Sequence, residues 1–373
     1  MNSSAPLIGI DAKRIVRNGT GLGSYGRTLV NDLAQYPLRL NLYAPDKGCD
    51  DLRSQIIARE NITFVYPTSR HFKSYWRSRG IIADLKRDGI QLYHGLSGEL
   101  PIGIRRSGIK SVVTIHDLIF LRHPEFYHPI DVQIYKWKFR QTLREADHII
   151  AISECTKRDI LEYGSDLVSE DRISLIYQSC SPRFEASPIG SSEDNQRYIL
   201  SVGSIEARKN VLQAVQALPY LPDEISLVIV GRHTPYTDRI STWAEQHGVA
   251  HRVRILHGVS DAELPALYAG AEAFVYPSVY EGFGIPIIEA VRCGLPVVAC
   301  TGSCLEEAGG PHNLYVAPGD VLGMADALRR SLKGAEDREQ RIQLSQQYIH
   351  RFDGNDVAGQ VVQLYERLLR ASI

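Results

Sequence analysis

Residues 278–290 are Ser-Val-Tyr-Glu-Gly-Phe-Gly-Ile-Pro-Ile-Ile-Glu-Ala, and the rest of the chain is organised around them. Residues 272–277 precede this stretch, and their apolar run with a closing proline predicts a short buried strand. Residues 286–293 follow with helical spacing, with a proline in the first turn and Gly294 past the end. The sequence therefore predicts a strand, a glycine turn and a helix here.

The turn between these two elements has the chemistry of an anion-binding site. Gly282 and Gly284 let the backbone approach a ligand closely, and the first N–H groups of the helix favour anions. Glu281 in the turn and Glu289 in the helix only accept hydrogen bonds when ionised. A nucleotide sugar, with hydroxyls at both ends and phosphates between them, matches this layout. The alternative is an ordinary turn with two glutamates that mildly stabilise the helix.

Composition limits the class of protein. A chain of 373 residues is long enough for two hydrophobic cores. A hydrophobic content of 44% and a charged content of 23% are ordinary for soluble globular proteins, and no run of 18 apolar residues predicts a membrane span. The first residues lack the features of a signal peptide, and the six cysteines form no zinc motif. We therefore expect a cytoplasmic protein with reduced thiols.

Charge is unevenly distributed along the chain. Residues 1–180 contain 25 Lys and Arg against 20 Asp and Glu, a net charge of +5, whereas the whole chain has −1. The overall balance gives no attraction to nucleic acid, but the basic half is suited to an anionic partner. Solvated surface charge is the alternative explanation of this asymmetry.

A glycine-rich segment follows the first predicted strand, residues 7–11. Residues 12–20 are predicted to be a polar loop, and residues 19–26, Gly-Thr-Gly-Leu-Gly-Ser-Tyr-Gly, to continue it into a helix over residues 27–34. Gly21–Gly26 also satisfies the dinucleotide fingerprint, with Asp46 at a suitable distance. An NAD-dependent enzyme is thus one alternative, although that site needs its glycines directly after the strand.

Two further strands end in polar residues. Residues 111–117 predict a strand that ends in His116 and Asp117, and residues 91–96 predict another that contains His94. Ligands gather at the carboxyl ends of strands in open α/β sheets, so these side chains are candidates for substrate contacts. A single histidine at a strand end is otherwise a structural polar residue.

A basic segment with interleaved aromatic residues spans residues 70–87. Phe72, Tyr75 and Trp76 lie among basic residues there, including Lys73, Arg77 and Arg79. Docking on an anionic membrane is one interpretation of this pattern, and nucleic-acid binding is another. A helix with a solvated basic face and core aromatic residues is the structural alternative.

Strands and helices alternate in both halves of the chain, which predicts two doubly wound domains. Residues 181–197 are rich in Pro, Ser and Gly and predict a linker. We expect domains at residues 1–181 and 198–352. Residues 353–373 are predicted to form an amphipathic C-terminal helix.

Arg208-Lys209-Asn210 lies between a predicted strand, residues 198–203, and a helix that begins at residue 211. Two cations at that position can neutralise a diphosphate, with Arg as a fork and Lys as a point charge. No Asp-x-Asp pair is suitably placed to hold a metal on a diphosphate. We therefore expect these cations and the helix after Gly284 to stabilise a leaving phosphate without a metal cofactor.

The spacing of Glu281 and Glu289 around a Glu-Gly-Phe-Gly core resembles the motif of the family 4 retaining glycosyltransferases. The glycine-rich loop, His116-Asp117, Ser153-Glu154 and Arg208-Lys209-Asn210 follow the family's order over nearly the whole chain. The resemblance implies the GT-B fold, with two Rossmann-like domains facing a cleft and a C-terminal helix that crosses back to the first domain. One departure is Leu305, where the family more often has proline.

The resemblance also implies roles for individual residues. Glu281, His116, Arg208 and Lys209 would form the catalytic group, and His94, His116 and Asp117 would line the acceptor side. The donor would be bound by Gly21, Arg208, Lys209, Gly258, Val259, Glu281, Phe283, Gly284, Ile285 and Glu289. In this scheme Glu281 meets the sugar, Glu289 the ribose, and Gly258-Val259 the base.

The implied reaction is transfer of a sugar from a nucleoside diphosphate donor to a glycan or lipid-linked acceptor, with retention of anomeric configuration. No residue stands out as a carboxylate nucleophile, so departure and attack on the same face is the favoured route. General resemblance to bacterial mannosyltransferases of surface polysaccharide favours GDP-mannose. The alternatives are a GT-B sugar-nucleotide epimerase, the NAD enzyme described above, and a sugar-binding module without turnover.

Overall fold

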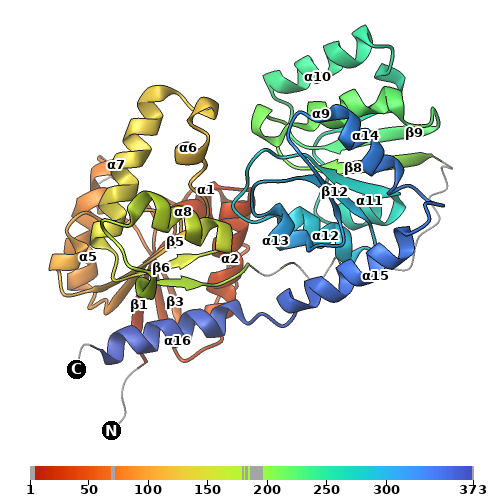
Figure 1. Ribbon diagram of the computed structural model, residues 1–373. Coiled ribbons are helices and arrows are strands. Elements are labelled where there is room, and N and C mark those ends of the chain that lie inside the picture. The colour runs from red at the N-terminus through yellow and green to blue at the C-terminus, as the bar shows by residue number, and fades with distance from the viewer. Residues whose placement is uncertain (1–4, 69–71, 179, 181–183, 185–195, 372–373) are drawn as a thin grey trace. The chain divides into compact units, whose positions relative to one another are not determined.

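The computed structural model describes residues 5–68, 72–178, 180, 184 and 196–371 (Figure 1). The chain forms two compact units. The first contains Met1–Gln178 together with Asn355–Ile373, and the second contains Ser179–Gly354. The predicted linker over residues 181–197 lies largely outside the described residues.

Within the described residues, the first unit is built on a sheet of seven parallel strands in the order β3-β2-β1-β4-β5-β6-β7. In the register, Ile8 of β1 lies opposite Leu40 on one side and Leu92 on the other. Parallel strands need crossovers, which the intervening helices supply. The strands are β1 (Leu7–Asp11), β2 (Arg39–Tyr43), β3 (Ile62–Val65), β4 (Leu92–Gly95), β5 (Lys110–Ile115), β6 (His148–Ala151) and β7 (Ile173–Leu175).

Helices cover both faces of this sheet. Alternate residues along each strand point to opposite faces, so Ile8 and Ile10 join one apolar cluster while Tyr93 joins the other. The helices are α1 (Lys13–Arg17), α2 (Gly21–Leu33), α3 (Asp50–Arg53), α4 (Lys73–Tyr75), α5 (Ile81–Arg87), α6 (Ile119–Arg122), α7 (Pro129–Glu145), α8 (Glu154–Gly164) and α16 (Val357–Arg370). A π-helical turn, Trp76–Gly80, joins α4 to α5.

The glycine-rich segment is not the predicted loop. Residues 13–17 form helix α1, and α2 already begins at Gly21. The Asn18 side chain accepts hydrogen bonds from the N–H groups of Thr20 and Gly23, at 2.9 and 3.2 Å, and so satisfies free donors at the start of α2. A Cβ atom at Gly23 would lie 1.8 Å from the Asn18 carbonyl oxygen, so this glycine serves helix packing. A dinucleotide turn directly after β1 is therefore not present.

The C-terminal helix α16 belongs to the first unit (Figure 1). Val361 and Tyr365 are fully buried in the same apolar cluster as α2 and the strands. The Tyr365 hydroxyl lies 2.6 Å from Nδ1 of His94, whose Nε2 lies 2.9 Å from the Thr114 hydroxyl. Burial lowers the pKa of His94 to about 3, so this histidine is neutral at pH 7 and serves the core.

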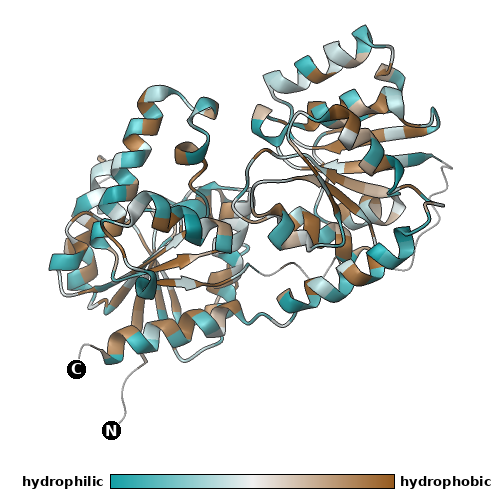
Figure 2. Cartoon of the chain, in the orientation of Figure 1, coloured by the Kyte–Doolittle hydropathy of each residue, from teal (hydrophilic) through white to brown (hydrophobic). Residues whose placement is uncertain are grey.

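The second unit has, among its described residues, a sheet of six parallel strands in the order β10-β9-β8-β11-β12-β13. Figure 2 shows that its central strands are hydrophobic, as expected for a sheet covered on both faces. The strands are β8 (Arg197–Val202), β9 (Ile225–Val230), β10 (Val253–Leu256), β11 (Ala273–Tyr276), β12 (Val297–Cys300) and β13 (Leu314–Val316).

The helices of the second unit include the one predicted after the glycine turn, α12, which begins at Ile285. They are α9 (Val211–Ala217), α10 (Pro235–Gln246), α11 (Leu264–Gly270), α12 (Ile285–Arg292), α13 (Leu305–Gly309), α14 (Val321–Arg329) and α15 (Arg338–Ile349). Gly294 follows α12 with φ of 76°, a backbone angle that favours glycine. None of the helices in the described ranges is long and apolar enough to cross a lipid bilayer.

Tyr365 gives a direct test of the attachment of α16 to the first unit. We expect Tyr365→Ala to lower the free energy of unfolding of this unit by about 3–5 kcal/mol, because it opens a cavity in the core. Tyr365→Phe keeps the packing but removes the partner of the buried His94, and should cost about 1–3 kcal/mol. Urea unfolding, with hydrogen exchange to assign the transitions, measures both values.

The matched control is Glu366→Ala on the exposed side of α16, which should change the free energy of unfolding by no more than about 0.5 kcal/mol. Equal effects of the Tyr365 and Glu366 substitutions would contradict the role assigned to α16.

Candidate active site

Two loops at the carboxyl edge of the second sheet form the centre of the site. β8 and β11 are neighbouring strands, so the loops that follow them meet. The loop after β8 carries a 3-10 turn, Ala207–Lys209, and the loop after β11 carries residues 277–284. The Val279 N–H donates to the Arg208 carbonyl at 2.9 Å, and the Arg208 guanidinium donates to the Tyr280 carbonyl at 3.0 Å. These bonds fix one loop against the other.

A cluster of charged side chains joins the two loops. The Lys209 ammonium lies 2.5 Å from Oε1 of Glu281, and the Arg208 guanidinium lies 3.1 Å from Oε2. The Lys209 ammonium also donates to the Tyr276 hydroxyl at 2.8 Å. Arg208 has a second carboxylate partner, Glu206, which is about half exposed. The structure therefore brings together Glu281, Arg208 and Lys209, as the sequence predicts.

Burial and charge act in opposite directions on this cluster. The Glu281 side chain is only 11% exposed, and burial alone would raise the pKa of its carboxyl. Lys209 and Arg208 outweigh that effect and hold the pKa of Glu281 below its usual value. Burial would lower the pKa of Lys209, but Glu281 raises it well above the usual value. Both side chains are therefore ionised at pH 7, in a region with little water.

Backbone geometry explains the residue types of the two loops. Asn210 has φ of 53°, a left-handed conformation that asparagine tolerates better than most residues, and it links the 3-10 turn to α9. Gly284 has φ of 128° and begins α12. A Cβ atom at Gly284 would lie 3.3 Å from Leu305, which is fully buried. Leu305, which stands where the family more often has proline, therefore packs against the turn.

The Cys304 thiol contacts the backbone of the glycine turn. Its thiol donates to the Phe283 carbonyl at 2.5 Å and to the Glu281 carbonyl at 3.2 Å. The Phe283 ring is buried and packs edge-on against Phe352 at 5.4 Å. The carbonyl groups of Glu281 and Phe283 are thus held toward the buried Cys304, which lies directly before α13.

Glu289 lies in helix α12 and is partly exposed. Its Oε2 accepts a hydrogen bond from the Tyr268 hydroxyl at 2.9 Å. Burial, reinforced by Glu289, raises the pKa of Tyr268 well above its usual value, so Tyr268 remains a donor at pH 7. This bond orients the Glu289 carboxylate.

Gly258 and Val259 follow β10 at the same carboxyl edge as the charged cluster. Gly258 has φ of 71° and is exposed, with open space where a Cβ atom would lie. β10 and β11 are separated by β9 and β8, which corresponds to about 14 Å between strand axes at the usual spacing. These two residues are therefore at one end of the edge, and Glu281 is at its centre.

The remaining predicted residues belong to the first unit. His94 is buried, and both of its ring nitrogens bond to hydroxyl groups of the core, those of Tyr365 and Thr114. The expectation that His94 contacts an acceptor is therefore wrong. His116 is partly exposed at the end of β5, and Asp117 accepts a hydrogen bond from the Ile119 N–H. Gly21 is exposed at the first residue of α2, not in a loop.

The hydrogen bonds of His116 define its protonation. Its Nε2 lies 2.9 Å from the Leu96 carbonyl, which only accepts, so Nε2 carries the proton. Nδ1 then accepts from the Gln178 amide at 3.1 Å. Burial lowers the pKa of His116 to about 4, so the ring is neutral at pH 7. This histidine can position a substrate, but its ring nitrogens already have partners.

Four contributors to the sites were missed in the sequence: Tyr268, Tyr276, Cys304 and Gln178. Tyr276 is the last residue of β11, so the rule that ligands gather at carboxyl ends of strands could have identified it. Cys304 and Gln178 carry no local signal, because only the folded chain brings them to Phe283 and His116. Among the described residues, no group of three or more His, Cys, Asp or Glu side chains is arranged to hold a metal ion.

Two family models match the chain. Glycosyltransferase Family 4 matches residues 19–181, and Glycosyl transferases group 1 matches residues 183–348. O-antigen chain mannosyltransferase B of Escherichia coli is 33% identical over 261 residues, which is 66% of this chain and 67% of that protein. The serotype-specific mannosyltransferase WbdA of Escherichia coli is 30% identical over 298 residues, 72% of this chain but only 36% of the longer relative.

Solved structures share the fold over the full chain. Sucrose-phosphate synthase from Thermosynechococcus elongatus superimposes with a TM-score of 0.78 over 98% of this chain and 100% of that one, at 20% sequence identity. At that identity the likeness concerns the fold alone. Together with the two parallel sheets, it confirms the predicted GT-B fold.

The buried cluster predicts a specific stability effect. Glu281→Gln leaves Arg208 and Lys209 without their buried counter-charge, and should lower the free energy of unfolding of the second unit by about 3 kcal/mol or more. The matched control is Glu206→Gln, which removes the exposed partner of Arg208 and should cost less than about 1 kcal/mol. Chemical unfolding of both variants at pH 7 measures the difference, and equal costs would show that Glu281 is not the structural centre of the cluster.

Proposed function

The chain belongs to the glycosyltransferases that combine a family 4 domain with a group 1 domain, and we propose that it transfers mannose from GDP-mannose to a glycan or lipid-linked acceptor. The observation that carries this proposal is the cluster of Glu281, Arg208 and Lys209 at the carboxyl edge of the second sheet. The choice of mannose as the donor sugar and of surface polysaccharide synthesis as the pathway is supported by the similarity to O-antigen and serotype-specific mannosyltransferases.

The cluster suits a nucleoside diphosphate sugar. Arg208 and Lys209 both bond to Glu281, and a diphosphate offers these cations a more highly charged partner. When the cations turn to the diphosphate, the Glu281 carboxylate becomes available for the hydroxyls of the sugar. The N–H groups of Phe283, Gly284 and Ile285, in the turn where α12 begins, complete the donor site.

The other end of the donor has matching features. Glu289 is oriented by Tyr268 and partly exposed, as a carboxylate that accepts from the ribose hydroxyls must be. Gly258 and Val259 at the end of β10 would contact the base. Donor atoms would thus lie along the carboxyl edge of the sheet, from β10 to the loop of β11.

Stabilisation of the leaving diphosphate is the main catalytic contribution in this account. Arg208 and Lys209 carry full charges in a poorly hydrated region, where they stabilise developing negative charge strongly. They supply the stabilisation that a metal would provide, so we propose a metal-independent reaction. The anomeric configuration is retained by departure and attack on one face, and the leaving phosphate helps to accept the acceptor's proton.

Two other functions are compatible with the same donor site and are distinguished by experiment. A sugar-nucleotide epimerase would use the same donor site but would change the sugar without transferring it. A sugar-binding module would bind the donor without turnover. The NAD alternative depends on a glycine turn after β1, where helix α1 lies instead.

A donor panel tests the proposal. In the presence of EDTA, we expect GDP-mannose to raise the melting temperature of the full chain more than UDP-glucose, UDP-galactose or NAD does. GDP-mannose should also be hydrolysed slowly to mannose and GDP, since water can replace the acceptor. A change of sugar without release of GDP would indicate an epimerase, and loss of turnover in EDTA with recovery in Mg²⁺ would contradict metal independence.

Glu289→Ala is the variant for this assay. A hydrogen bond to a charged acceptor contributes about 1.5–3 kcal/mol, so the donor KM should rise by about ten- to a hundredfold. Tyr268→Phe, which removes only the group that orients Glu289, should have a smaller effect in the same direction. Unchanged donor binding in Glu289→Ala would disprove the assignment to the ribose.

We also propose that the first unit docks on an anionic membrane. In the segment over residues 70–87, Phe72 and Tyr75 are 82% and 63% exposed, and Arg79 is exposed. Trp76 instead packs partly against the core, and Arg77 is held by Asp11 and Glu99. The prediction that Trp76 and Arg77 contribute to a membrane-facing surface is therefore wrong. The surface to be tested consists of Phe72 and Arg79.

Vesicle sedimentation tests this docking. The wild type should sediment with anionic vesicles at low salt and be released at high salt, since basic residues near such a surface each contribute about 1 kcal/mol. F72S/R79S should sediment much less. The control L322S/R232S replaces one exposed apolar residue and one exposed arginine of the second unit by serine, and should behave as the wild type does. Equal sedimentation of both double variants would remove the membrane role of this surface.

A further inference from the structure

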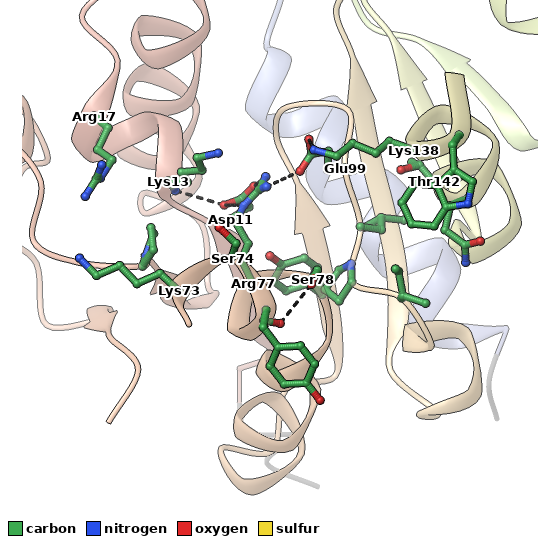
Figure 3. Close-up of a pocket in the computed structure, with 18 of the residues that line it drawn as sticks. Asp11, Lys13, Arg17, Lys73, Ser74, Arg77, Ser78, Glu99, Lys138 and Thr142 are labelled. Atoms are coloured by element: carbon green, nitrogen blue, oxygen red, sulfur yellow. Dashed lines mark hydrogen bonds and ion pairs between the residues drawn. The ribbon is translucent and has the colours of Figure 1, made fainter. Parts of the chain in front are cut away.

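A cavity with a volume of 560 Å³ lies within the first unit (Figure 3). It opens where β1 and β2 end and where α1, α4 and α7 approach one another. Its volume falls within the range of roughly 300–1,000 Å³ that small-molecule sites occupy. None of the functions argued above uses its charged side chains.

The centre of this cavity is electrically balanced. The Arg77 guanidinium lies 2.6 Å from Asp11, which is almost fully buried, and also pairs with Glu99. The Lys138 ammonium lies 3.0 Å from the other oxygen of Glu99. Burial would raise the pKa of Glu99, but Arg77 and Lys138 lower it to about 2, so the group is ionised. Two cations thus match two carboxylates here.

The other end of the cavity carries excess positive charge. Arg17 and Lys73 both bond to Asp46, with the Lys73 ammonium at 2.7 Å. Lys13 lines the same cavity, and its ammonium has no ion pair within the part of the chain that the structure describes. Figure 3 shows these three basic residues on one side of the Asp11–Arg77 pair and Lys138 on the other. Three cations against one carboxylate leave two positive charges unmatched.

An anion of matching charge would relieve this imbalance. Burial, reinforced by the nearby Arg77, lowers the pKa of Lys13, which shows that its positive charge is disfavoured where it stands. A phosphate monoester carries about −1.5 to −2 charges at pH 7 and has three acceptor oxygens. It is therefore matched in charge to this end of the cavity.

The walls beside the charged groups are suited to a sugar. Tyr75 and Trp137 line the cavity and are 63% and 54% exposed, so their rings offer apolar faces to the C–H surface of a sugar. The hydroxyls of Ser74, Ser78 and Thr142 also line it and can bond to sugar hydroxyls. Charged, aromatic and hydroxyl groups thus converge on one space.

We propose that this cavity binds a phosphorylated sugar, free or lipid-linked, with the phosphoryl group against Lys13, Arg17 and Lys73 and the sugar ring beside Tyr75 and Trp137. The proposal deepens the proposed function, on which it rests, because such a compound would be the acceptor. The acceptor would therefore be an anionic saccharide.

Calorimetric titration of the full chain tests this assignment. The probes are mannose 1-phosphate, mannose 6-phosphate, glucose 6-phosphate, the neutral parent hexoses and inorganic phosphate. At least one hexose phosphate should bind about tenfold more tightly than its neutral parent and than inorganic phosphate, and high salt should weaken it. The decyl ester of mannose 1-diphosphate, whose charge is close to that of the monoester, is compared with mannose 1-phosphate to distinguish a lipid-linked ligand from a free one, and tighter binding of either supports the proposal.

Lys13→Gln is the decisive variant, because it breaks no ion pair. It should weaken hexose phosphate binding by about tenfold, and Lys13→Arg should retain most of the affinity. Lys86→Gln makes the same charge change on the exposed face of α5, outside the cavity, and should leave binding unchanged.

Wild-type affinity in Lys13→Gln, equal binding of neutral and phosphorylated hexoses, equal binding of inorganic phosphate, or no binding of any probe would each overturn the proposal. Donor binding by the second unit is measured on the same variants with GDP-mannose. If the wild type does not bind GDP-mannose, the proposed donor is refuted, but the assignment of this cavity is unaffected.

Discussion

A buried ion cluster is the constraint on which the site depends. Glu281 comes from the loop after β11, and Arg208 and Lys209 come from the loop after β8. Each charge would be costly to bury alone, because little water reaches this region. The three side chains therefore stabilise one another only when the two loops meet, which requires that their strands be neighbours in the sheet. The charged site is thus a consequence of the sheet order.

Much of the second unit could be predicted from local sequence. The run before Pro277, the two glycines and the helix after Gly284 follow from propensity and backbone geometry, and the structure has these elements. The pairing of Glu281 with Lys209 could not be predicted in the same way, because 72 residues separate them in the chain. Only the adjacency of β8 and β11 brings them together, and adjacency of strands has no local signal.

In the first unit, the roles of the glycines and of His94 were harder to predict from the sequence. Gly21, Gly23 and Gly26 have the spacing of a ligand-binding loop, yet Gly23 packs against the Asn18 carbonyl and Gly26 packs against Ile15, so packing alone requires a small residue at these two positions. His94 lies in a strand near a predicted ligand edge, but helix α16, more than 250 residues later, covers it with Tyr365. The charged cavity was also beyond prediction, since its basic residues come from α1, α4, α7 and the π-helical turn, and only the fold shows which of them lack carboxylate partners.

In the proposed donor complex, Arg208 and Lys209 bind the diphosphate of the donor instead of Glu281. A crystal structure of the full chain with GDP bound to the second unit measures the distances between these groups directly. We expect diphosphate oxygens at about 2.7–3.2 Å from both the Lys209 ammonium and the Arg208 guanidinium, with the Glu281 carboxylate no longer bonded to Lys209. GDP bound elsewhere, or bound here with the Lys209–Glu281 distance unchanged at 2.5 Å, would contradict it.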